Sequence, residues 1–241
     1  MHLAIDIGNT ALKFALFDGE RMTVKGAGIE ALETELVHHA SFVTGSLISS
    51  VTDQANASEL LKKLNIPFST LSARTPLPIA NLYRSPDTLG ADRITLAVAV
   101  HHLFAGAAAL VIGAGTCITY DLVEDGNYHG GAISPGITMR FRALHDYTSR
   151  LPLIDWGGQR HEAYETITGT DSQSSIMTGV LKGALHEIDG TIEAYKSRYS
   201  GLRVAVTGGD MDFLVKNLKN DIFARPDMVL EGLNYILLHN A

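Results

Sequence analysis

Residues 2–19 read His-Leu-Ala-Ile-Asp-Ile-Gly-Asn-Thr-Ala-Leu-Lys-Phe-Ala-Leu-Phe-Asp-Gly, and they contain the pattern on which the predicted fold rests. The apolar run over His2–Ile7 predicts a strand, and the small polar residues at 8–10 predict a turn. A second strand is expected over 11–17, and the Asp-Gly pair at 18–19 is typical of a hairpin turn. The chain therefore begins with a strand–turn–strand unit.

The same unit returns 107 residues later, so that Gly8 falls on Gly115 and Gly19 on Gly126. The second copy has a strand ending at Ile112, a glycine-rich turn, another strand and a second Asp-Gly pair. A supersecondary unit repeated at half-chain spacing indicates an internal duplication. We expect two similar halves, residues 1–106 and 107–241, which would face each other across a cleft.

Helical and extended patterns alternate along the rest of the chain, which predicts an α/β fold. Further strands are expected near residues 22–27, 42–51, 68–71, 108–113 and 202–207. Helices are expected near residues 29–38, 57–64, 91–105, 137–147, 174–199 and 228–239. Residues 75–90 contain three prolines and should form a loop.

Composition narrows the classes of function. The 241 residues carry a net charge of -7 and no basic stripe, so a nucleic-acid partner is not expected. The single cysteine, Cys117, excludes a disulfide within the chain and favours a reducing, cytoplasmic setting. Residues 94–120 lack Asp, Glu, Lys and Arg, but two histidines and three glycines interrupt them. They favour a buried helix followed by a buried strand over a membrane span.

Three glycine-containing loops, at residues 8–10, 113–116 and 207–210, each follow a predicted strand directly. Small residues allow backbone N–H groups to approach a phosphate closely. A single loop of this kind is weak evidence, but two of the three are related by the repeat. Phosphoryl transfer also needs a metal near the phosphates and a base aligned with the acceptor hydroxyl.

Asp6 lies near the end of an otherwise apolar strand, where a carboxylate is costly to bury unless it is paired or binds a metal. Mg²⁺ commonly uses one or two protein carboxylates together with water and phosphate. Lys13 on the second strand could reach a phosphate as a point charge. In the alternative interpretation, Asp6 caps the turn and Lys13 is a solvated surface residue.

The combination of motifs resembles the type III pantothenate kinases over nearly the whole chain. Residues 6–13 are similar to the first phosphate motif, and residues 115–121 to most of the second. Asn81-x-Tyr83 and the Gly-Ala-Asp-Arg run at 90–93 resemble the pantothenate motif. Two further motifs match at 130–136 and 207–210. The resemblance implies an actin-like (ribonuclease H-like) duplicated fold and ATP-dependent phosphorylation of pantothenate to 4′-phosphopantothenate, the first step of coenzyme A biosynthesis.

The resemblance also implies roles for individual residues. Asp92 would be the general base, and Asp121 would bind a monovalent cation, K⁺ or NH₄⁺. A homodimer would complete the substrate pocket. ATP and Mg²⁺ would be bound by Asp6, Gly8, Asn9, Thr10, Lys13, Gly115, Thr116, Gly208 and Gly209, with Asp6 as the Mg²⁺ ligand. Pantothenate would be bound by Tyr83, Gly90, Ala91, Arg93 and Ser172.

The residues alone leave other interpretations open for three of these positions. Asp92 could be the N-cap or a first-turn acid of the helix that follows it. Tyr83 could be an ordinary aromatic residue in a loop, and Asp121 a polar residue at a strand end.

One position departs from the family pattern. The second phosphate motif normally begins with Asp, and the repeat independently pairs this position with Asp6, but the residue here is Gly113. The loss could shift metal binding to Asp6 and Asp121, or it could mark a catalytically degenerate, ligand-binding regulator of the same fold. A kinase acting on another small alcohol is a further alternative. A DNA-binding regulator has little support, because the chain is acidic.

Overall fold

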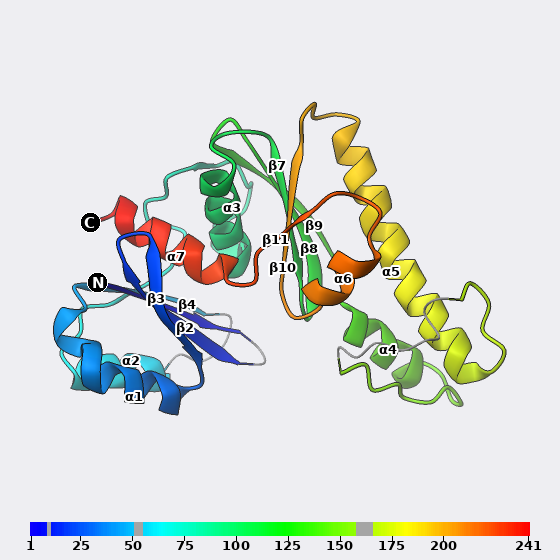
Figure 1. Ribbon diagram of the computed structural model, residues 1–241, viewed down its shortest axis with the longest axis horizontal. Helices are drawn as coiled ribbons and strands as arrows, with labels where there is room; N and C mark the ends of the chain where they lie inside the picture. Colours follow the sequence, from blue (N-terminus) through cyan, green and yellow to red (C-terminus); the bar gives the residue numbers. More distant parts are fainter. Residues whose placement is uncertain (9–10, 51–54, 158–165) are drawn as a thin grey trace. The chain divides into compact units, whose positions relative to one another are not determined.

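A computed structural model describes residues 1–8, 11–50, 55–157 and 166–241 (Figure 1). The chain forms two compact units. The first contains Met1–Gly106, Val123–Gly130 and Asp227–Ala241; the second contains Ala107–Leu122 and Gly131–Pro226. The first unit therefore includes two segments from the second half of the chain. The expected division into residues 1–106 and 107–241 stays a prediction.

The first sheet has the strand order β3-β2-β1-β4-β5. Its central strand β1 pairs antiparallel with β2 and parallel with β4. The strands are β1 (His2–Ile7), β2 (Leu12–Asp18), β3 (Arg21–Ala27), β4 (Gly45–Ser50) and β5 (Ser69–Thr70). The helices of this unit are α1 (Ile29–His39), α2 (Ala55–Lys63), α3 (Ala91–Leu103) and α7 (Met228–His239), with 3₁₀ turns at Ala40–Phe42 and Pro86–Thr88.

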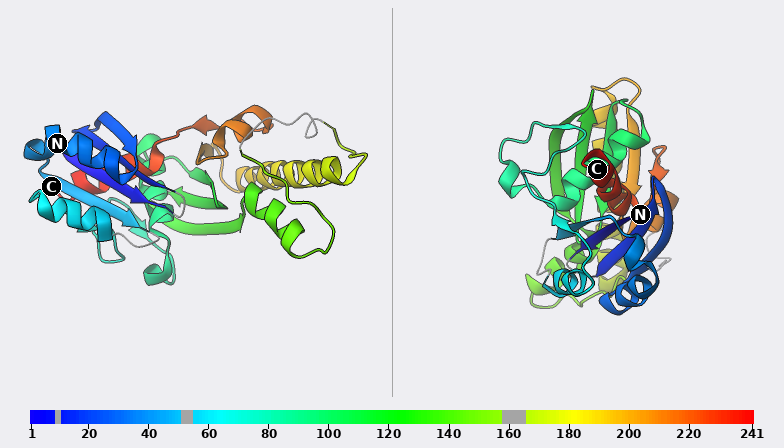
Figure 2. Two further views of the ribbon diagram at one scale, coloured as in Figure 1. Left: turned by 90° about the horizontal axis from the view of Figure 1, so that it is seen from below. Right: turned by 90° about the vertical axis from the view of Figure 1, so that its left-hand side faces the viewer.

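Alternation along β1 decides which side chains meet which helices, because successive strand residues point to opposite faces. Leu3, Ile5 and Ile7 pack in one cluster with apolar residues of α1 and α2. The even-numbered residues face the other side, where His2 Nδ1 lies 3.3 Å from Asn234 Oδ1 of α7. Asp6 belongs to this second face, and helices α3 and α7 pack against each other there (Figure 2).

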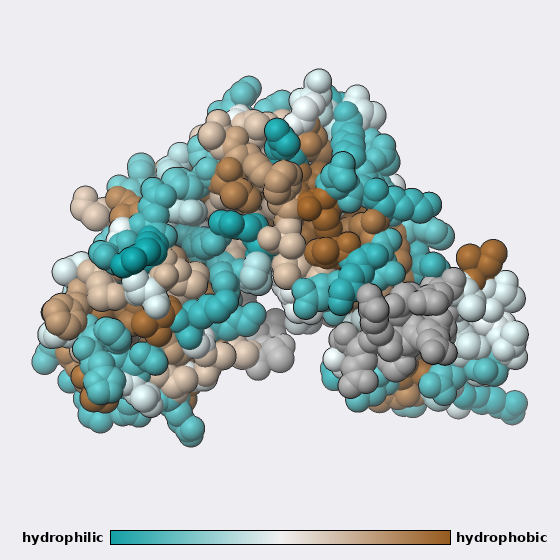
Figure 3. Space-filling model, viewed as in Figure 1, coloured by the Kyte–Doolittle hydropathy of each residue, from teal (hydrophilic) through white to brown (hydrophobic). Residues whose placement is uncertain are grey.

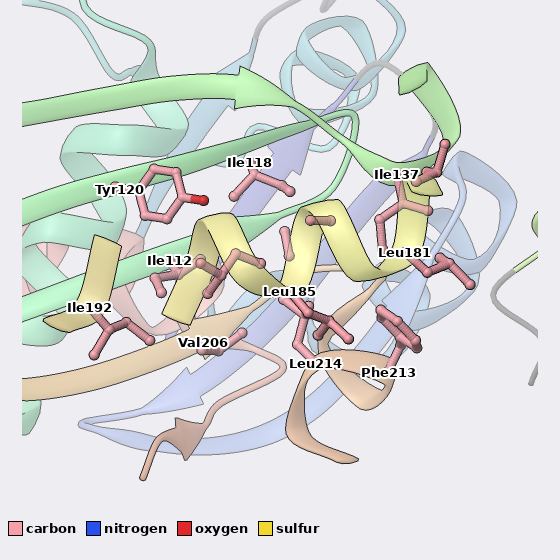
Figure 4. Close-up of a cluster of buried hydrophobic side chains, with 14 of the residues drawn as sticks. Ile112, Ile118, Tyr120, Ile137, Leu181, Leu185, Ile192, Val206, Phe213 and Leu214 are labelled. Atoms are coloured by element: carbon pink, nitrogen blue, oxygen red, sulfur yellow. The ribbon is translucent and has the colours of Figure 1, made fainter. Parts of the chain in front are cut away.

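The second sheet has the order β11-β10-β7-β8-β9-β6. Its strands are β7 (Ala109–Ala114), β8 (Cys117–Glu124), β9 (Asn127–Pro135), β10 (Arg203–Thr207), β11 (Phe223–Ala224) and the short β6 (Ala80–Asn81). The helices are α4 (Ile137–Asp146), α5 (Ser172–Lys196) and α6 (Met211–Asn217). Side chains from these helices form one buried cluster with alternate residues of β7, β8 and β10 (Figure 4).

The expected duplication is confirmed by the strand orders. Reading 3-2-1-4-5 in the first sheet and 9-8-7-10-11 in the second gives the same topology, with β6 added at one edge. His2–Ile7 and Ala109–Ala114 differ by the predicted 107 residues at both ends. The register also repeats, because Asp6 lies opposite Ser49 just as Gly113 lies opposite Thr207. The chain therefore folds as two copies of one α/β unit.

Several predicted boundaries differ from the structure, and three of the differences have clear local reasons. The strand expected over 42–51 is shorter, because a 3₁₀ turn occupies Ala40–Phe42 before β4 begins. Helix α3 ends at Leu103 because the next turn contains Ala105 with φ of 49°, outside the helical region. Helix α5 begins at Ser172 because Asp171 and Ser174 form a reciprocal capping box. The loop predicted for 75–90 also contains β6 and a 3₁₀ turn.

Among the described residues, no helix combines the length and apolarity needed to cross a membrane. Hydrophilic residues predominate on the face shown in Figure 3, interrupted by smaller apolar patches. Several large apolar side chains are exposed, among them Tyr147 and Ile167, at 89% and 87%.

Candidate active site

Asp6 lies at the centre of a polar cluster in the first unit. Strand pairing places it opposite Lys13 on β2 and opposite Ser49 on β4. Cross-strand partners share one face of the sheet, so all three side chains point toward the side covered by α3 and α7. Lys13 is exposed and Ser49 is fully buried.

The pKa of Asp6 is raised from 3.8 to about 6, mainly because burial disfavours the charged form. The nearby Asp92 carboxylate raises it further, while Ser49 and Lys13 lower it. Ser49 is the larger of the two lowering influences on this pKa, although its Oγ makes no hydrogen bond of ordinary geometry to the described residues. The Asp6 carboxylate is thus buried near that of Asp92 in a setting that disfavours its charged form, which fits a divalent cation.

Asp92 is held at the start of α3. Gly90 is the N-cap residue and its carbonyl accepts hydrogen bonds from the amides of Arg93 and Ile94, at 3.1 and 3.3 Å. A Cβ at Gly90 would lie 2.5 Å from Asp92 Oδ1, so a side chain there would displace the carboxylate. Asp92 is therefore a first-turn acid and not the N-cap, and Gly90 leaves the space that its carboxylate occupies.

Tyr83 and Arg93 contact each other beside this helix start. Arg93 is almost fully buried, and its guanidinium carbon lies 5.6 Å from the centroid of the Tyr83 ring. Tyr83 also stacks on the buried ring of Tyr128 at 6.1 Å between centroids. Gly130 has φ of +94°, and a Cβ there would come within 3.0 Å of Tyr83. Tyr83 is consequently a packed, half-buried residue and not a free aromatic of a loop.

The two phosphate-type loops of the second unit lie against each other. The amide of Asp210 donates to the carbonyl of Ala114 at 3.1 Å. Gly208 has φ of +103°, and a Cβ there would lie 2.1 Å from the same carbonyl oxygen. Gly115 and Gly209 are exposed, with no atom within 4 Å of where a Cβ would be. Their backbones are therefore open to a ligand, as a phosphate cradle requires.

Residues 134–136, where β9 ends and the chain turns into α4, support one of these loops and are called the 134–136 turn below. The Gly136 amide donates to the Thr116 carbonyl at 3.1 Å, and a Cβ at Gly136 would lie 2.2 Å from the Gly115 oxygen. Gly131, in the same motif, passes so close to Tyr120 that a Cβ would overlap its carbonyl oxygen, at 1.6 Å. The glycines of this motif thus allow backbone contacts that hold the loop and β8.

Asp121 and Ser172, both expected from the resemblance, lie in the second unit. Asp121 is fully buried on β8, on the face opposite Tyr120 because neighbouring strand residues alternate. Ser172 is the exposed first residue of α5 and not a residue ahead of it. Asn9 and Thr10 lie outside the described residues. Gly8 precedes them and donates its amide hydrogen to the Ala11 carbonyl at 3.1 Å.

Gly113 confirms that the repeat is asymmetric at its most important position. It lies on β7 opposite Thr207, where the first repeat has Asp6 opposite Ser49. No cluster of three or more His, Cys, Asp or Glu side chains suited to a metal occurs within the ranges that the structure describes. A cation near Asp6 and Asp92 would therefore need ligands from elsewhere, such as phosphate oxygens and water.

Sequence reasoning missed three contributors to this arrangement. Ser49, buried beside Asp6, sits in a strand whose pattern predicts only burial. Tyr128 supports Tyr83 from a distant part of the chain. Trp156 donates Nε1–H to Asp210 Oδ1 at 3.0 Å, while burial raises the pKa of that carboxyl. None of the three carries a local motif.

Comparisons with known proteins agree with this geometry. The family described as "Type III pantothenate kinase" matches residues 2–194. A protein of that name from Bacteroides fragilis is 45% identical over 100% of this chain and 98% of its own length. A protein of the same name from Christiangramia forsetii is 40% identical over 100% of this chain and 99% of its own length.

Solved structures show the same fold at low identity. A Baf family transcriptional activator from Campylobacter jejuni superposes with a TM-score of 0.62 at 20% identity, covering 99% of this chain and 98% of that one. The ROK hexokinase from Thermus thermophilus gives 0.53 at 13% identity, with 99% of both chains covered. At these sequence identities, the structural similarity shows a shared actin-like ATPase fold but does not show a shared activity. The full-length sequence relatives and the family match decide the family: this chain is a member of the type III pantothenate kinases.

Proposed function

We propose that this protein transfers the γ-phosphoryl group of ATP to the primary hydroxyl of pantothenate, giving 4′-phosphopantothenate and ADP, the first step of coenzyme A biosynthesis. The observation that carries the proposal is the start of α3, where Gly90 and Asp92 stand beside the Tyr83–Arg93 pair. This arrangement sits in a chain whose full-length relatives are named pantothenate kinases.

Asp92 is the proposed general base. The pantothenate oxygen forms a bond to the γ-phosphorus as the bond from that phosphorus to the bridging oxygen of ADP breaks. The hydroxyl proton passes to the Asp92 carboxylate. A carboxylate is a weak base, so its contribution comes mainly from alignment of the hydroxyl for attack. The space at Gly90 and the fixed first turn of α3 support that alignment.

Pantothenate and ATP would be bound by different residues. Tyr83, Gly90, Ala91 and Arg93 would bind pantothenate, and Arg93 would act together with the ring that it contacts. The loops containing Gly115 and Thr116, and Gly208 and Gly209, would offer open backbone to the phosphates of ATP. Gly8, Asn9, Thr10 and Lys13 would contribute from the first repeat.

Asp6 is the proposed ligand for Mg²⁺, which would offset phosphate charge when bound. The fit rests on two neighbouring carboxylates, one of them buried enough to have a raised pKa. Asp121 is the proposed ligand for a monovalent cation, K⁺ or NH₄⁺. It lies fully buried on β8, the strand that follows the Gly115–Thr116 loop.

We further propose a cytoplasmic homodimer in which Ser172 of one protomer completes the pantothenate pocket of its partner. The exposed position of Ser172 at the start of α5 is compatible with such a contact. The degenerate-regulator alternative rested on Gly113 alone, and no finding on the fold or the family favours it.

The test is ADP release from ATP and Mg²⁺ with and without pantothenate, in K⁺ and in Na⁺ buffers. We expect pantothenate-dependent turnover that is faster in K⁺ and that is abolished in Asp92→Asn. Asp87→Asn, which removes an exposed acid in the preceding 3₁₀ turn, is the matched control and should remain active. Folded wild-type protein that turns over in no buffer would remove the kinase assignment.

A further inference from the structure

The turn that supports the phosphate loop is itself held by a charged side chain. Arg140, on α4, donates through Nε to the Pro135 carbonyl at 2.8 Å and through Nη2 to Ser134 Oγ at 2.9 Å. Its guanidinium also pairs with the carboxylate of Glu187 on α5. One side chain therefore connects the end of β9, the start of α4 and the middle of α5.

Glu187 extends this connection to β8. Its second carboxylate oxygen accepts a hydrogen bond of 2.8 Å from the hydroxyl of Tyr120, whose ring lies beside α5 (Figure 4). Burial alone would raise the pKa of Glu187, but hydrogen bonds from Arg140, Tyr120 and Ser134 outweigh it and lower that pKa. Glu187 is thus ionised and paired with Arg140, and the side chains of this pair are only 30% and 20% exposed.

The turn has little freedom to move without its neighbours. Arg140 follows Gly136 by one helical turn, and its amide donates to the Gly136 carbonyl at 3.0 Å. Gly136 in turn contacts the carbonyl oxygens of Gly115 and Thr116. Any displacement of the turn is therefore transmitted to the exposed backbone that faces a ligand. Packed contacts of this kind transmit sub-ångström shifts because protein interiors are dense.

From this geometry we infer that Arg140, held by Glu187 and Tyr120, is a positioning residue for the nucleotide: it fixes the 134–136 turn and through it the Gly115–Thr116 loop. The inference rests on the proposed function of that loop as a phosphate cradle. Arg140 touches neither substrate nor phosphate in this account. Loss of its guanidinium should weaken ATP binding while leaving pantothenate binding, which is assigned to α3 in the first unit, nearly unchanged.

Arginine is suited to this task because its planar fork can serve three acceptors at once. Lysine keeps the charge but has a single ammonium group, so Arg140→Lys should restore only part of the effect. Arg140→Met keeps an unbranched side chain as long as the arginine stem up to Nε and removes every polar contact. Tyr120→Phe removes one hydrogen bond to Glu187 and leaves the ring in the core.

The experiment measures the Kd of ATP by calorimetry without pantothenate, and then the KM of each substrate. We expect Arg140→Met to raise the Kd and the KM for ATP by about tenfold, since charge-assisted contacts of this kind are lost. Arg140→Lys should raise them by about threefold and Tyr120→Phe by about twofold, with the KM for pantothenate within about twofold throughout.

Asp189→Asn provides the matched control. Asp189 lies two residues beyond Glu187 on α5 and accepts hydrogen bonds from the amides of Lys219 and Asn220, far along the chain from the phosphate loop. Its substitution should lower the melting temperature but leave the Kd for ATP within about twofold, as expected for sites that share no partners.

The inference fails if folded Arg140→Met binds ATP as the wild type does, or if Asp189→Asn weakens ATP binding equally. If Arg140→Met does not fold, the graded pair Arg140→Lys and Tyr120→Phe carries the test, and unchanged ATP binding in both would overturn it. The ATP-binding measurement needs no turnover, so absence of pantothenate phosphorylation in the wild type would overturn the proposed function separately.

Discussion

The two copies of the repeat share a backbone but differ in charge at the end of their central strands. In the first copy, Asp6 on β1 lies opposite Ser49; in the second, Gly113 on β7 lies opposite Thr207. Both copies keep a hydroxyl residue on the neighbouring parallel strand. Only the first keeps a carboxylate, and burial together with Asp92 raises its pKa to about 6.

At a second pair of positions, the second copy has the buried acid and the first copy does not. Asp121 is fully buried on β8, and its counterpart 107 residues earlier is Phe14, a core residue of β2. The duplication therefore fixes strand order and register while each copy places its buried acid on a different strand. The first repeat therefore contains the two acids that we propose for Mg²⁺ binding and proton transfer, Asp6 and Asp92. The second repeat contributes glycine backbone and one separate acid.

Among the positions at which the two repeats differ, the largest expected effect follows removal of the acid at the end of β1. Asp6→Asn should lower kcat/KM by about 10²–10³-fold, as is typical for loss of a group that stabilises transferring charge. Steady-state ADP release at saturating Mg²⁺ measures it. Asp18→Asn, an exposed acid at the end of β2, is the control. Nearly full activity in Asp6→Asn would show that the two repeats do not differ in function as described.

The same substitution should stabilise the metal-free protein. A carboxyl pKa raised from 3.8 to about 6 means that the folded state disfavours the charged form, at a cost of about 2–3 kcal/mol above pH 6. Neutral Asn removes this cost. Denaturant unfolding should therefore show Asp6→Asn more stable than wild type at pH 8, with the difference shrinking as pH falls from 6 toward 4. A variant that is less stable at pH 8 would contradict the assigned desolvation.

Asp121→Asn tests the separate acid of the second repeat. Removing its charge should lower kcat/KM by about tenfold in K⁺ and abolish the advantage of K⁺ over Na⁺, because the cation loses its compensating carboxylate. Initial rates over a K⁺ titration measure this directly. If the variant retains the full K⁺ response, the monovalent cation binds elsewhere and the division between the repeats must be redrawn.

The smallest expected effect on rate comes from restoring symmetry. Gly113→Asp places an acid where the first repeat has one, and we expect kcat to change by no more than about threefold, since Asp6 and Asp92 are the acids proposed for metal binding and proton transfer. The partly buried new carboxylate should instead lower stability by about 1–3 kcal/mol. A rate gain well above tenfold, measured beside Gly113→Asn, would mean that the second repeat lacks a group that catalysis needs.

Much of this arrangement could be predicted from sequence, because it depends on short-range patterns. The apolar run over β1, the turns at Asp-Gly pairs and the repeat offset identify the duplicated strands. The strand-following glycines identify the loops. These features are local in the chain, so composition and spacing report them directly.

The supporting contacts could not be predicted in the same way. Tyr128, which contacts Tyr83, follows it by 45 residues in the chain, and Glu187 follows its partner Arg140 by 47. Neither contact has a periodic or motif signature, because each depends on how separate elements pack. The start of α5 was misplaced by two residues for a simpler reason: the capping box uses Asp171 and Ser174, and the apolar pattern begins later.

The kinase assignment is tested first by identifying the product that the wild-type protein forms from ATP and pantothenate, with Asp92→Asn alongside. We predict a single new species, pantothenate carrying one phosphoryl group on its primary hydroxyl, formed in equal amount to ADP and missing in the variant. ADP formed without phosphorylated pantothenate, or an equal yield from Asp92→Asn, would contradict the account.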